Sequence, residues 1–391
     1  MKKILIVNKS FELGGIQTSM INMANALSQY YDVHLFVYNP SGMLKERLNR
    51  NIKVIEPNWL FRCLGMSAKS VLKTKSIKMI AFRLFAGVWS KLFNNELPLN
   101  IAIRRQPKMT GYDLAVAYHQ ERRKNAVVSG FTRVVDRCTE ASKKVAWVHF
   151  DCNAIDLDSQ FNMPFYNKMD KVVCVSRSLM ENFEKAYPEL IGKLDYCYNF
   201  MLYDVMKEKS SEKQEVEYPS DKFVCFSACR LTEEKALVRG ISALSEVFKA
   251  HKEVVWYIAG DGVERGNIEN AIKSYGLEQQ IVLIGNQSNP YPYMRNANLV
   301  LNVSYHEAAP MIFFESKALG TPVFATRTSS ATELLTDGVD SFICENSEDG
   351  IRERFADIIK NKHCVESAKL QLAKYHSDNE ESLLKIREMI E

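Results

Sequence analysis

Residues 299–323 read LVLNVSYHEAAPMIFFESKALGTPV, and this stretch indicates the fold most clearly. The apolar run at its start is typical of a buried strand. Pro310 suits the first position of a helix, where its missing N–H would have no partner in any case. The helix pattern ends at Gly320, with Pro322 just beyond it. A strand, a small turn and a helix in this order predict one βα unit of a parallel sheet.

The same alternation extends outward through the chain. Short apolar runs predict strands at 4–7, 33–38, 52–55, 114–117, 145–148, 172–175, 223–228, 254–259, 281–284, 299–303, 323–325 and 342–344. Helical spacing of apolar residues falls between them, at 17–28, 233–249, 267–275, 311–319 and 349–360. The polar stretch 207–222 is typical of a linker. We therefore predict an α/β protein of two Rossmann-like, doubly wound domains, 1–204 and 205–368, that face each other across a cleft.

Composition excludes several classes of protein. The chain has 391 residues, of which 46% are hydrophobic and 25% charged, unlike a disordered or collagen-like chain. A net charge of +4 is too small to indicate nucleic-acid binding. The nine cysteines are scattered and odd in number, which favours reduced thiols in the cytoplasm. No export signal is predicted, because only a short apolar run, 4–7, follows the first lysines.

The helix that begins after Pro310 predicts a place for an anion. Its first amides, at Met311 and Ile312, have no acceptor within the helix, and such an end attracts phosphate. Glu307 lies before the helix and Glu315 about a turn and a half inside it. Both carboxylates could therefore reach hydroxyls of one ligand. The alternative, a surface glutamate and a helix salt bridge, fits the spacing of these two acids equally well.

Two cations follow the predicted strand 223–228. Arg230 and Lys235 stand on either side of a turn into a helix, for which Thr232 is a suitable N-cap. A guanidinium and an ammonium in these places could both contact one diphosphate. Either cation taken alone is more often a solvated surface residue, so the interpretation depends on the 307–315 region nearby.

The first half of the chain offers two further candidates. Gly14-Gly15 follows the strand 4–7 and precedes a helix, so its backbone could approach a phosphate or a sugar closely. An ordinary tight turn explains these glycines equally well. His149 follows the strand 145–148, at the sheet edge where α/β proteins bind ligands. A structural histidine is the equal alternative.

Two motifs that suggest other chemistry are discounted. The Gly-Asp-Gly at 260–262 resembles the start of a dinucleotide fingerprint, but Arg265 stands where the third glycine belongs. The Asp-x-Asp at 156–158 could hold a metal-bound diphosphate, although chance readily produces such a triplet in a chain of this composition. We predict no metal site.

Residues 62–95 interrupt the alternation. They contain seven basic residues and neither Asp nor Glu. Apolar residues stand at helical spacing within them, at Ile77, Ile80, Ala81, Leu84 and Val88. This pattern predicts either a basic amphipathic surface that rests on anionic lipid or a helix pair that packs on the core with a solvated basic face.

In this order the motifs resemble the family 4 retaining glycosyltransferases of the GT-B fold. The matching residues are Arg230-Leu231-x-x-Glu234-Lys235, Gly260-Asp261-Gly262, and Glu307-x7-Glu315 followed by Ala318-x-Gly320-Thr321-Pro322-Val323. Gly14-Gly15 and His149 fit the N-terminal domain of that family. The resemblance is strong over 223–345 and weaker over 1–200.

The resemblance implies a nucleotide-diphosphate sugar, with UDP as the expected nucleotide, as the donor substrate. Arg230 and Lys235 would neutralise the diphosphate in place of a metal ion, so no metal or other cofactor is expected. Glu307 would hold hydroxyls of the donor sugar, close to the amides of Met311 and Ile312.

The remaining donor contacts are implied in the same way. Glu315 would accept hydrogen bonds from the ribose, and the turn at Gly285 and Asn286 would meet the base. Gly15 would line the space near the donor phosphates. His149 would contact the sugar from the other domain when the cleft closes. The segment 369–391 would be a helix that crosses back to the N-terminal domain.

The acceptor implied by the resemblance is a polyprenyl-diphosphate-linked glycan in the synthesis of a bacterial surface polysaccharide such as a capsule. The protein would then be cytoplasmic and peripheral on the inner membrane face. The chain departs from the family at Ala236, where glycine is common, and at Ala308-Ala309, where glycine and a bulky residue are usual. Two alternatives stay open: a GT-B-fold nucleotide-sugar 2-epimerase and a non-catalytic nucleotide-sugar-binding protein.

Overall fold

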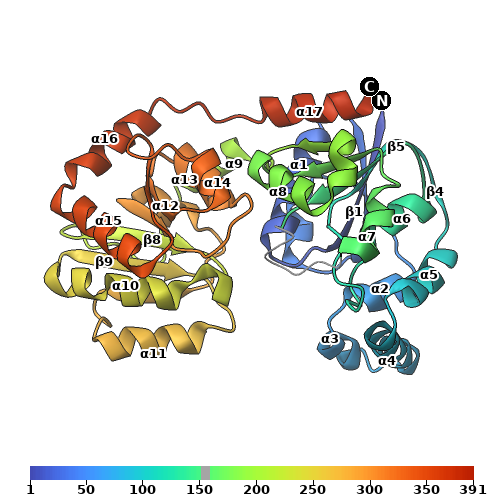
Figure 1. Cartoon of the computed structure of the whole chain (residues 1–391), viewed down its shortest axis with the longest axis horizontal. Coiled ribbons are helices and arrows are strands. Elements are labelled where there is room, and N and C mark those ends of the chain that lie inside the picture. Colours follow the sequence, from blue (N-terminus) through green and yellow to red (C-terminus); the bar gives the residue numbers. More distant parts are fainter. Residues whose placement is uncertain (151–158) are drawn as a thin grey trace. The chain divides into compact units, whose positions relative to one another are not determined.

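The structure is a computed structural model that describes residues 1–150 and 159–391. The chain forms two units, one of Met1–Met201 with Asn379–Glu391 and the other of Leu202–Asp378. Each unit is a parallel sheet with helices against its faces (Figure 1). The predicted α/β class with two Rossmann-like domains is confirmed. We call the two parts unit 1 and unit 2.

The described residues of unit 1 contain a seven-stranded sheet in which all neighbouring strands are parallel. In spatial order the strands are β3 (Lys53–Ile55), β2 (Asp32–Asn39), β1 (Lys3–Ser10), β4 (Met109–Ala117), β5 (Thr139–Val148), β6 (Lys171–Cys174) and β7 (Leu194–Tyr196). The strand order reverses between β1 and β4. Parallel sheets bind ligands at such a switch point, beyond the carboxyl ends of the strands.

The helices of unit 1 connect these strands, and the last of them returns from unit 2. They are α1 (Gly15–Leu27), α2 (Trp59–Gly65), α3 (Ala68–Lys73), α4 (Ile77–Leu92), α5 (Glu96–Arg104), α6 (Phe131–Cys138), α7 (Ser159–Tyr166), α8 (Arg177–Ala186) and α17 (Glu380–Ile390), with 3-10 turns η1 (Met43–Arg47) and η2 (Pro188–Lys193). Polar residues before α2 and α3 cap these helices: the side chains of Asn58 and Ser67 accept hydrogen bonds from the first-turn amides.

Unit 2 repeats the arrangement with a six-stranded parallel sheet. Its strands are β10 (Ile281–Gly285), β9 (Val254–Ala259), β8 (Phe223–Ala228), β11 (Leu299–Asn302), β12 (Val323–Thr326) and β13 (Ser341–Cys344). Its helices are α9 (Tyr203–Lys209), α10 (Leu237–Ala250), α11 (Arg265–Tyr275), α12 (Tyr291–Asn296), α13 (Met311–Ala318), α14 (Ser329–Leu334), α15 (Glu348–Lys360) and α16 (His363–Leu372), with the 3-10 turn η3 (Glu233–Lys235). The switch point of this sheet lies between β8 and β11.

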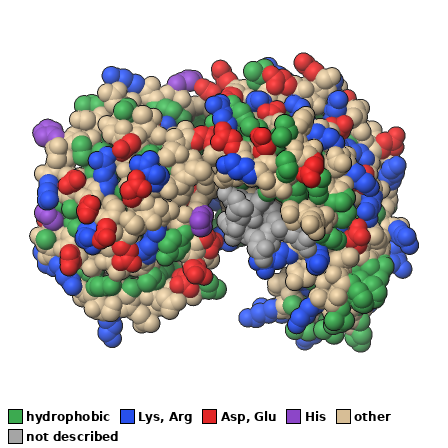
Figure 2. Space-filling view, in the orientation of Figure 1, with side chains coloured by type: hydrophobic (Ala, Val, Ile, Leu, Met, Phe, Trp, Pro, Cys, Tyr) green, Lys and Arg blue, Asp and Glu red, His purple; other side chains and the backbone are tan. Residues whose placement is uncertain are grey.

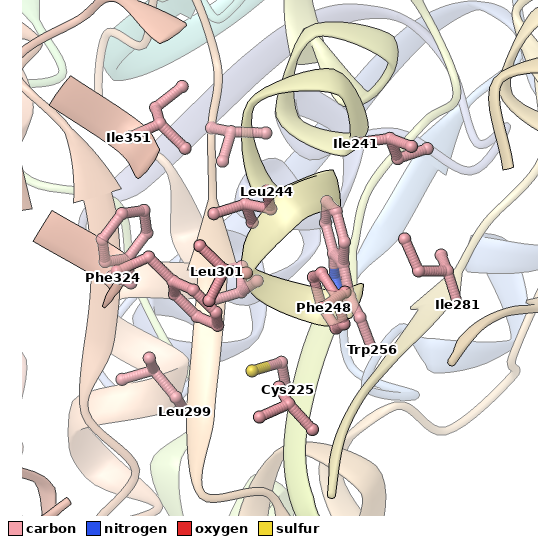
Figure 3. Close-up of a cluster of buried hydrophobic side chains, with 14 of the residues drawn as sticks. Cys225, Ile241, Leu244, Phe248, Trp256, Ile281, Leu299, Leu301, Phe324 and Ile351 are labelled. Atoms are coloured by element: carbon pink, nitrogen blue, oxygen red, sulfur yellow. The ribbon is translucent and has the colours of Figure 1, made fainter. Parts of the chain in front are cut away.

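The core of unit 2 lies on both faces of its sheet, because alternate residues of each strand point to opposite sides. On β9, Trp256 and Ile258 belong to the cluster under α10, α11 and α15, whereas Val255 and Tyr257 belong to the cluster on the other face. Figure 3 shows Trp256 in the first cluster beside side chains of α10 and the neighbouring strands. A strand covered on both faces must be apolar throughout, as β9 is.

The structure corrects two details of the expected helices. The helix expected from Thr232 begins at Leu237, and Thr232 makes no side-chain cap. The reason is Ala236, whose left-handed backbone, with φ at 52°, separates the 3-10 turn from the helix. The single helix expected over 369–391 is instead the end of α16, a non-helical connection and α17. Within the described ranges, no helix is long and apolar enough to cross a bilayer.

Candidate active site

The two sequence motifs of unit 2 meet at the switch point of its sheet. β8 and β11 are hydrogen-bonded neighbours, so the loops that follow them leave the same edge side by side. The amide of Tyr305, in the loop after β11, donates to the carbonyl of Glu234, in the loop after β8, at 3.0 Å. The loop that carries Lys235 and the loop that carries Glu307 are therefore joined directly.

Lys235 and Glu307 form the central ion pair of this edge. The Lys235 Nζ lies 2.6 Å from the Glu307 Oε1. The same oxygen accepts hydrogen bonds from Ser304 Oγ at 2.7 Å and Asn302 Nδ2 at 3.2 Å. The Glu307 carbonyl is held by Ser330 Oγ at 2.9 Å. None of the bonds recorded for the described residues reaches Glu307 Oε2, which leaves this oxygen able to accept from a ligand hydroxyl.

The surroundings keep Lys235 charged. Burial alone would lower the pKa of the Lys235 ammonium, but the adjacent Glu307 carboxylate outweighs it and raises the pKa above its ordinary value. The Lys235 side chain is 19% exposed and that of Glu307 9%. A permanent cation at the open edge of the sheet, with only part of its surface covered, can attract an incoming phosphate.

Arg230 lies nearby but has a different partner. Its side chain is 62% exposed and pairs with Glu234, with the Arg230 Nη2 and Glu234 Oε1 3.4 Å apart. Both ion pairs surround the Cys229 thiol: burial raises the pKa of this thiol to about 12, while Lys235 and Arg230 act against the rise and Glu307 and Glu234 add to it. Arg230 therefore lies at the same strand end as Lys235. To bind a diphosphate, its guanidinium would have to leave Glu234.

The Gly-Asp-Gly segment after β9 shapes this edge. A Cβ on Gly260 would lie 1.9 Å from the Cys229 carbonyl oxygen, and one on Gly262 would lie 2.2 Å from that of Leu231. The Leu231 amide also donates to the Asp261 carbonyl at 3.0 Å. Both glycines are therefore needed for close backbone packing. This packing positions the loop that carries Arg230 and explains the motif without a dinucleotide.

The amino end of α13 lies just beyond Glu307. The helix begins at Met311 after Pro310, and the Phe313 amide donates to the Pro310 carbonyl at 3.1 Å. The amides of Met311 and Ile312 belong to the first turn, where a helix supplies no acceptor. They carry the positive end of the helix dipole, which favours an anion. The expected helix start at 311 is observed.

Glu315, one turn further along α13, is a partly buried acid without a partner. No hydrogen bond or ion pair to its carboxylate is recorded within the described part of the chain. Burial raises its pKa to about 7. Glu315 also acts on Tyr203 of α9. Burial raises the pKa of the Tyr203 phenol most, and the charge of Glu315 is among the smaller contributions that raise it further. No hydrogen bond or ion pair between described residues joins Glu315, on α13, to Glu307, in the loop before it.

Gly285 and Asn286 end β10 at the same edge of the sheet. Gly285 has a left-handed backbone, with φ at 71°, and its carbonyl accepts from the Gly260 amide at 2.8 Å. Asn286 is exposed. The positive φ explains why glycine stands at this turn, and the exposed residue after it is available to a ligand.

In unit 1, Gly15 is the first residue of α1. A Cβ built on Gly15 would meet no atom within 4 Å, so the space beside its backbone is open. The first turn is closed by the Thr18 amide, which donates to the Gly14 carbonyl at 2.8 Å. The helix therefore starts a short loop after β1, which ends at Ser10, at the switch point of this sheet. The sequence pattern predicts such a helix after Gly14-Gly15.

His149 is buried beyond the end of β5. Its Nε2 lies 3.0 Å from the Tyr118 carbonyl oxygen, which can only accept, so Nε2 carries the proton. Burial, with a smaller contribution from His119, lowers the pKa of His149 to about 3. Gln120 Oε1 accepts from the amides of His149 and Phe150 at 2.8 and 2.7 Å and fixes this loop. The imidazole is therefore neutral and presents Nδ1 as an acceptor.

The described residues contain no group of three or more His, Cys, Asp and Glu side chains that could hold a metal ion. The Asp-x-Asp at 156–158 lies outside the residues that the structure describes.

Sequence reasoning missed the residues that hold Glu307. Asn302, Ser304 and Ser330 bind its side chain and its carbonyl. A signal was present for one of them, because Asn302 ends an otherwise apolar strand, where a polar residue needs a partner. Ser330 gives no such signal, since it stands on α14 and reaches Glu307 only through the fold.

The chain is similar to known glycosyltransferases. Residues 208–376 match the family "Glycosyl transferases group 1". An O-antigen biosynthesis glycosyltransferase of Escherichia coli is 26% identical over 179 residues, which are 45% of this chain and 49% of the relative. A Campylobacter jejuni N-acetylgalactosaminyltransferase, named for a diphospho-undecaprenol substrate, is 23% identical over 343 residues, 86% of this chain and 84% of the relative.

A solved structure shows the same fold. The HepE protein of Anabaena, in complex with UDP and glucose, superimposes with a TM-score of 0.70 at 18% identity and covers 100% of this chain and 99% of its own. Other relatives match over 39–46% of their own length, so the chain spans a little less than half the length of these relatives. Residues 208–376 are thus similar to the group 1 glycosyl transferases, and the fold of the chain is GT-B.

Proposed function

We propose that the chain is a retaining glycosyltransferase of family 4 that moves a hexosyl unit from a nucleotide-diphosphate sugar, UDP-linked, to a lipid-linked glycan. The observation that carries this proposal is the Lys235–Glu307 pair at the switch point of unit 2, beside the amino end of α13. Together, the ion pair and the start of α13 supply a cation, a carboxylate oxygen that is free to accept, and helix amides at one edge of the sheet.

The cations and the helix start would bind the diphosphate. Lys235 would turn from Glu307 toward the phosphates or share its protons between them, and the amides of Met311 and Ile312 would donate to the same group. Arg230 would leave Glu234 and add a second cation. Positive charge from side chains would stabilise the departing diphosphate, and activity in the presence of EDTA is the expected result.

The acids and the sheet-edge turn would bind the rest of the donor. Glu307 Oε2 would accept from a sugar hydroxyl, and Glu315 from the ribose hydroxyls. The proposal for Glu315 is supported by its burial and by the absence of a partner among the residues that the structure describes. Gly285 and Asn286 would contact the base. From unit 1, neutral His149 would accept from a sugar hydroxyl through Nδ1, and Gly15 would leave space for the phosphates.

The transfer would proceed on one face of the sugar. The bond between the anomeric carbon and the diphosphate oxygen breaks, and the acceptor oxygen forms a bond to the same carbon from the same side. The acceptor's hydroxyl proton moves to the departing phosphate oxygen. Lys235, Arg230 and the amides of α13 stabilise the charge that develops on that phosphate.

The proposed acceptor is a polyprenyl-diphosphate-linked glycan of a bacterial surface polysaccharide such as a capsule. Support comes from the Campylobacter relative, whose name specifies a diphospho-undecaprenol substrate, and from the O-antigen relative. With an acceptor of this kind, the protein would work on the cytoplasmic face of the inner membrane as a peripheral enzyme.

Incubation of the protein with labelled UDP-sugars and a membrane extract tests the proposal. Label transferred to lipid with retained anomeric configuration is expected, with or without EDTA. Release of an isomerised free sugar would show a nucleotide-sugar 2-epimerase instead. Binding without turnover for every sugar would show a non-catalytic nucleotide-sugar-binding protein.

A further inference from the structure

Helix α4 has an apolar face that the rest of unit 1 does not cover. Successive helical residues turn by about 100°, which puts positions 77, 81, 84, 88 and 92 on one side. These positions are exposed and apolar: Ile77 is 84%, Leu84 65%, Val88 58% and Leu92 69% exposed, and Ala81 is exposed as well. We call these five residues the α4 stripe.

The opposite side of α4 already packs on unit 1. Phe82, Ala86 and Ser90 are buried, and they lie about 180° around the helix from the stripe. The helix contacts α2, α3 and α5. The packing of α4 on unit 1 therefore does not involve the stripe. A packed core helix, one of the two alternatives for this segment, does not explain why its apolar spacing points to solvent.

The rim of the stripe is basic. Lys69, Lys73, Lys75, Lys78 and Lys91 are all exposed, and no Asp or Glu occurs between positions 56 and 96. The two arginines of the segment face other groups: Arg62 pairs with Glu56, and Arg83 donates to the Leu64 carbonyl at 3.2 Å. Figure 2 shows hydrophobic side chains gathered at the lower right, where Figure 1 places α4, with Lys and Arg side chains beside them.

The charge of this rim decides between possible occupants. A second copy of the chain on the same surface would bring two sets of lysines together with no acid to compensate them. An anionic bilayer offers the matching charge and an apolar layer just beneath it. Aromatic residues suited to that boundary stand beside the stripe, with the Trp89 and Phe93 rings 4.6 Å apart and Phe93 58% exposed.

We propose that α3 and α4 dock on an anionic phospholipid surface, with the α4 stripe entering the headgroup boundary and the five lysines at the level of the lipid phosphates. This surface follows from the exposure of α4 and does not depend on the proposed activity. The lysines attract the protein electrostatically to the anionic lipids. The apolar contact of the stripe with the bilayer persists when salt screens that attraction.

The test is flotation of the full chain with vesicles of phosphatidylcholine that contain roughly one-third phosphatidylglycerol. Binding is expected with these vesicles, much less with pure phosphatidylcholine, and less again as salt rises. The double variant Leu84→Glu, Val88→Glu should bind at least about tenfold more weakly, because it removes two inserted side chains and adds two like charges. Leu370→Glu is the matched control, since Leu370 of α16 is similarly exposed, at 68%, outside the stripe.

Tryptophan fluorescence provides a second readout. Trp147 and Trp256 are buried, whereas Trp59 and Trp89 are partly exposed and belong to α2 and α4. Vesicle binding should therefore shift the emission to the blue, and Trp89→Phe should remove most of the shift. No binding at low salt, equal loss in the Leu370→Glu control, or a dimer in lipid-free solution that the double variant abolishes would overturn the proposal.

Discussion

The ion pair Glu121–Arg133 of unit 1 joins the loop after β4 to helix α6, and the ion pair Lys235–Glu307 of unit 2 joins the loops after β8 and β11. The two pairs differ in how fully their carboxylate oxygens are used. Glu121 is fully buried, and both of its carboxylate oxygens are used. They accept from Ser129 Oγ and the Gly130 amide at 2.8 Å, from the Thr132 amide at 3.1 Å and from Arg133 Nη2 at 3.0 Å. This carboxylate therefore has no oxygen left for a ligand, and we call the cluster closed on that ground, although the buried Arg133 Nε has no hydrogen-bond partner among the described residues.

The pair in unit 2 is open. Glu307 uses one oxygen for three donors and keeps the other, and Lys235 remains 19% exposed. Glu315 stands on α13, and no described residue forms a hydrogen bond or ion pair with its carboxylate. Where every acceptor has a donor, the ion pair holds the fold together, and where acceptors and a cation are left over, the same chemistry can bind a ligand. The difference between the two pairs identifies unit 2 as the donor-binding part in our proposal.

Removing Glu121 should have the largest effect. The variant Glu121→Ala leaves the buried Arg133 guanidinium without its counter-charge, which is expected to lower the free energy of unfolding by about 3–5 kcal/mol. Denaturant unfolding followed by circular dichroism measures this. Glu307→Ala is the control from the open pair and should cost less, because the Lys235 ammonium that it leaves behind is still 19% exposed and can be hydrated. Equal losses in the two variants would contradict the distinction between closed and open pairs.

Removing Lys235 should weaken donor binding more than it weakens the fold. Loss of a charge-assisted contact to a diphosphate weakens the free energy of binding by about 2–3 kcal/mol. Lys235→Ala should therefore bind UDP about 30- to 150-fold more weakly. Arg230→Ala should lose less, because Arg230 is exposed and must first leave Glu234. Calorimetry with UDP measures both, with Lys222→Ala as a control from the far end of β8. An unchanged affinity in Lys235→Ala would remove the basis of the proposed site.

The unpaired Glu315 should make unit 2 less stable as the pH rises. Its pKa is raised from 4.5 to about 7 in the folded chain, so between these values the folded state holds a proton that the unfolded state has lost. The contribution of Glu315 to the free energy of unfolding then falls with rising pH, by about 3 kcal/mol in all, and the loss is complete above the folded pKa. Burial lowers the pKa of His149 to about 3 and that of His119 to about 4, so in this range these two residues of unit 1 gain a proton on unfolding and contribute the opposite slope. Urea unfolding of the chain and of Glu315→Gln across this range should therefore differ by the contribution of Glu315.

The sheets could be predicted from sequence because their strands are short apolar runs that keep their character when both faces are buried. Each expected strand overlaps an observed one, whereas β7, with the residues Leu-Asp-Tyr, was missed because it is short and half exposed. The joining of the Lys235 and Glu307 loops follows from strand order, which places β11 beside β8.

Individual contacts could not be predicted, because they depend on which of several nearby partners a side chain reaches. Lys235 and Glu307 are 72 residues apart in sequence, and Arg230 was expected beside Lys235 but pairs with Glu234. The α4 stripe shows the same limit. Helical spacing predicts an apolar face, but only the packing of Phe82 and Ala86 shows that the other face is the buried one.

Backbone strain gives the smallest effect and separates the two ion pairs once more. Next to Glu121 the left-handed position, with φ at 88°, is occupied by Gly130, whereas next to Lys235 the left-handed position, with φ at 52°, is occupied by Ala236. An alanine in this conformation costs about 1–2 kcal/mol, and glycine's greater freedom in the unfolded chain offsets part of that. Ala236→Gly should therefore stabilise unit 2 by about 0.5–1 kcal/mol, measured by thermal unfolding. Gly130→Ala should act in the opposite direction and more strongly, because its Cβ would lie 2.1 Å from Leu99 Cδ2. If Ala236→Gly raised stability but lowered UDP affinity, the strained turn would be holding Lys235 in place for the ligand.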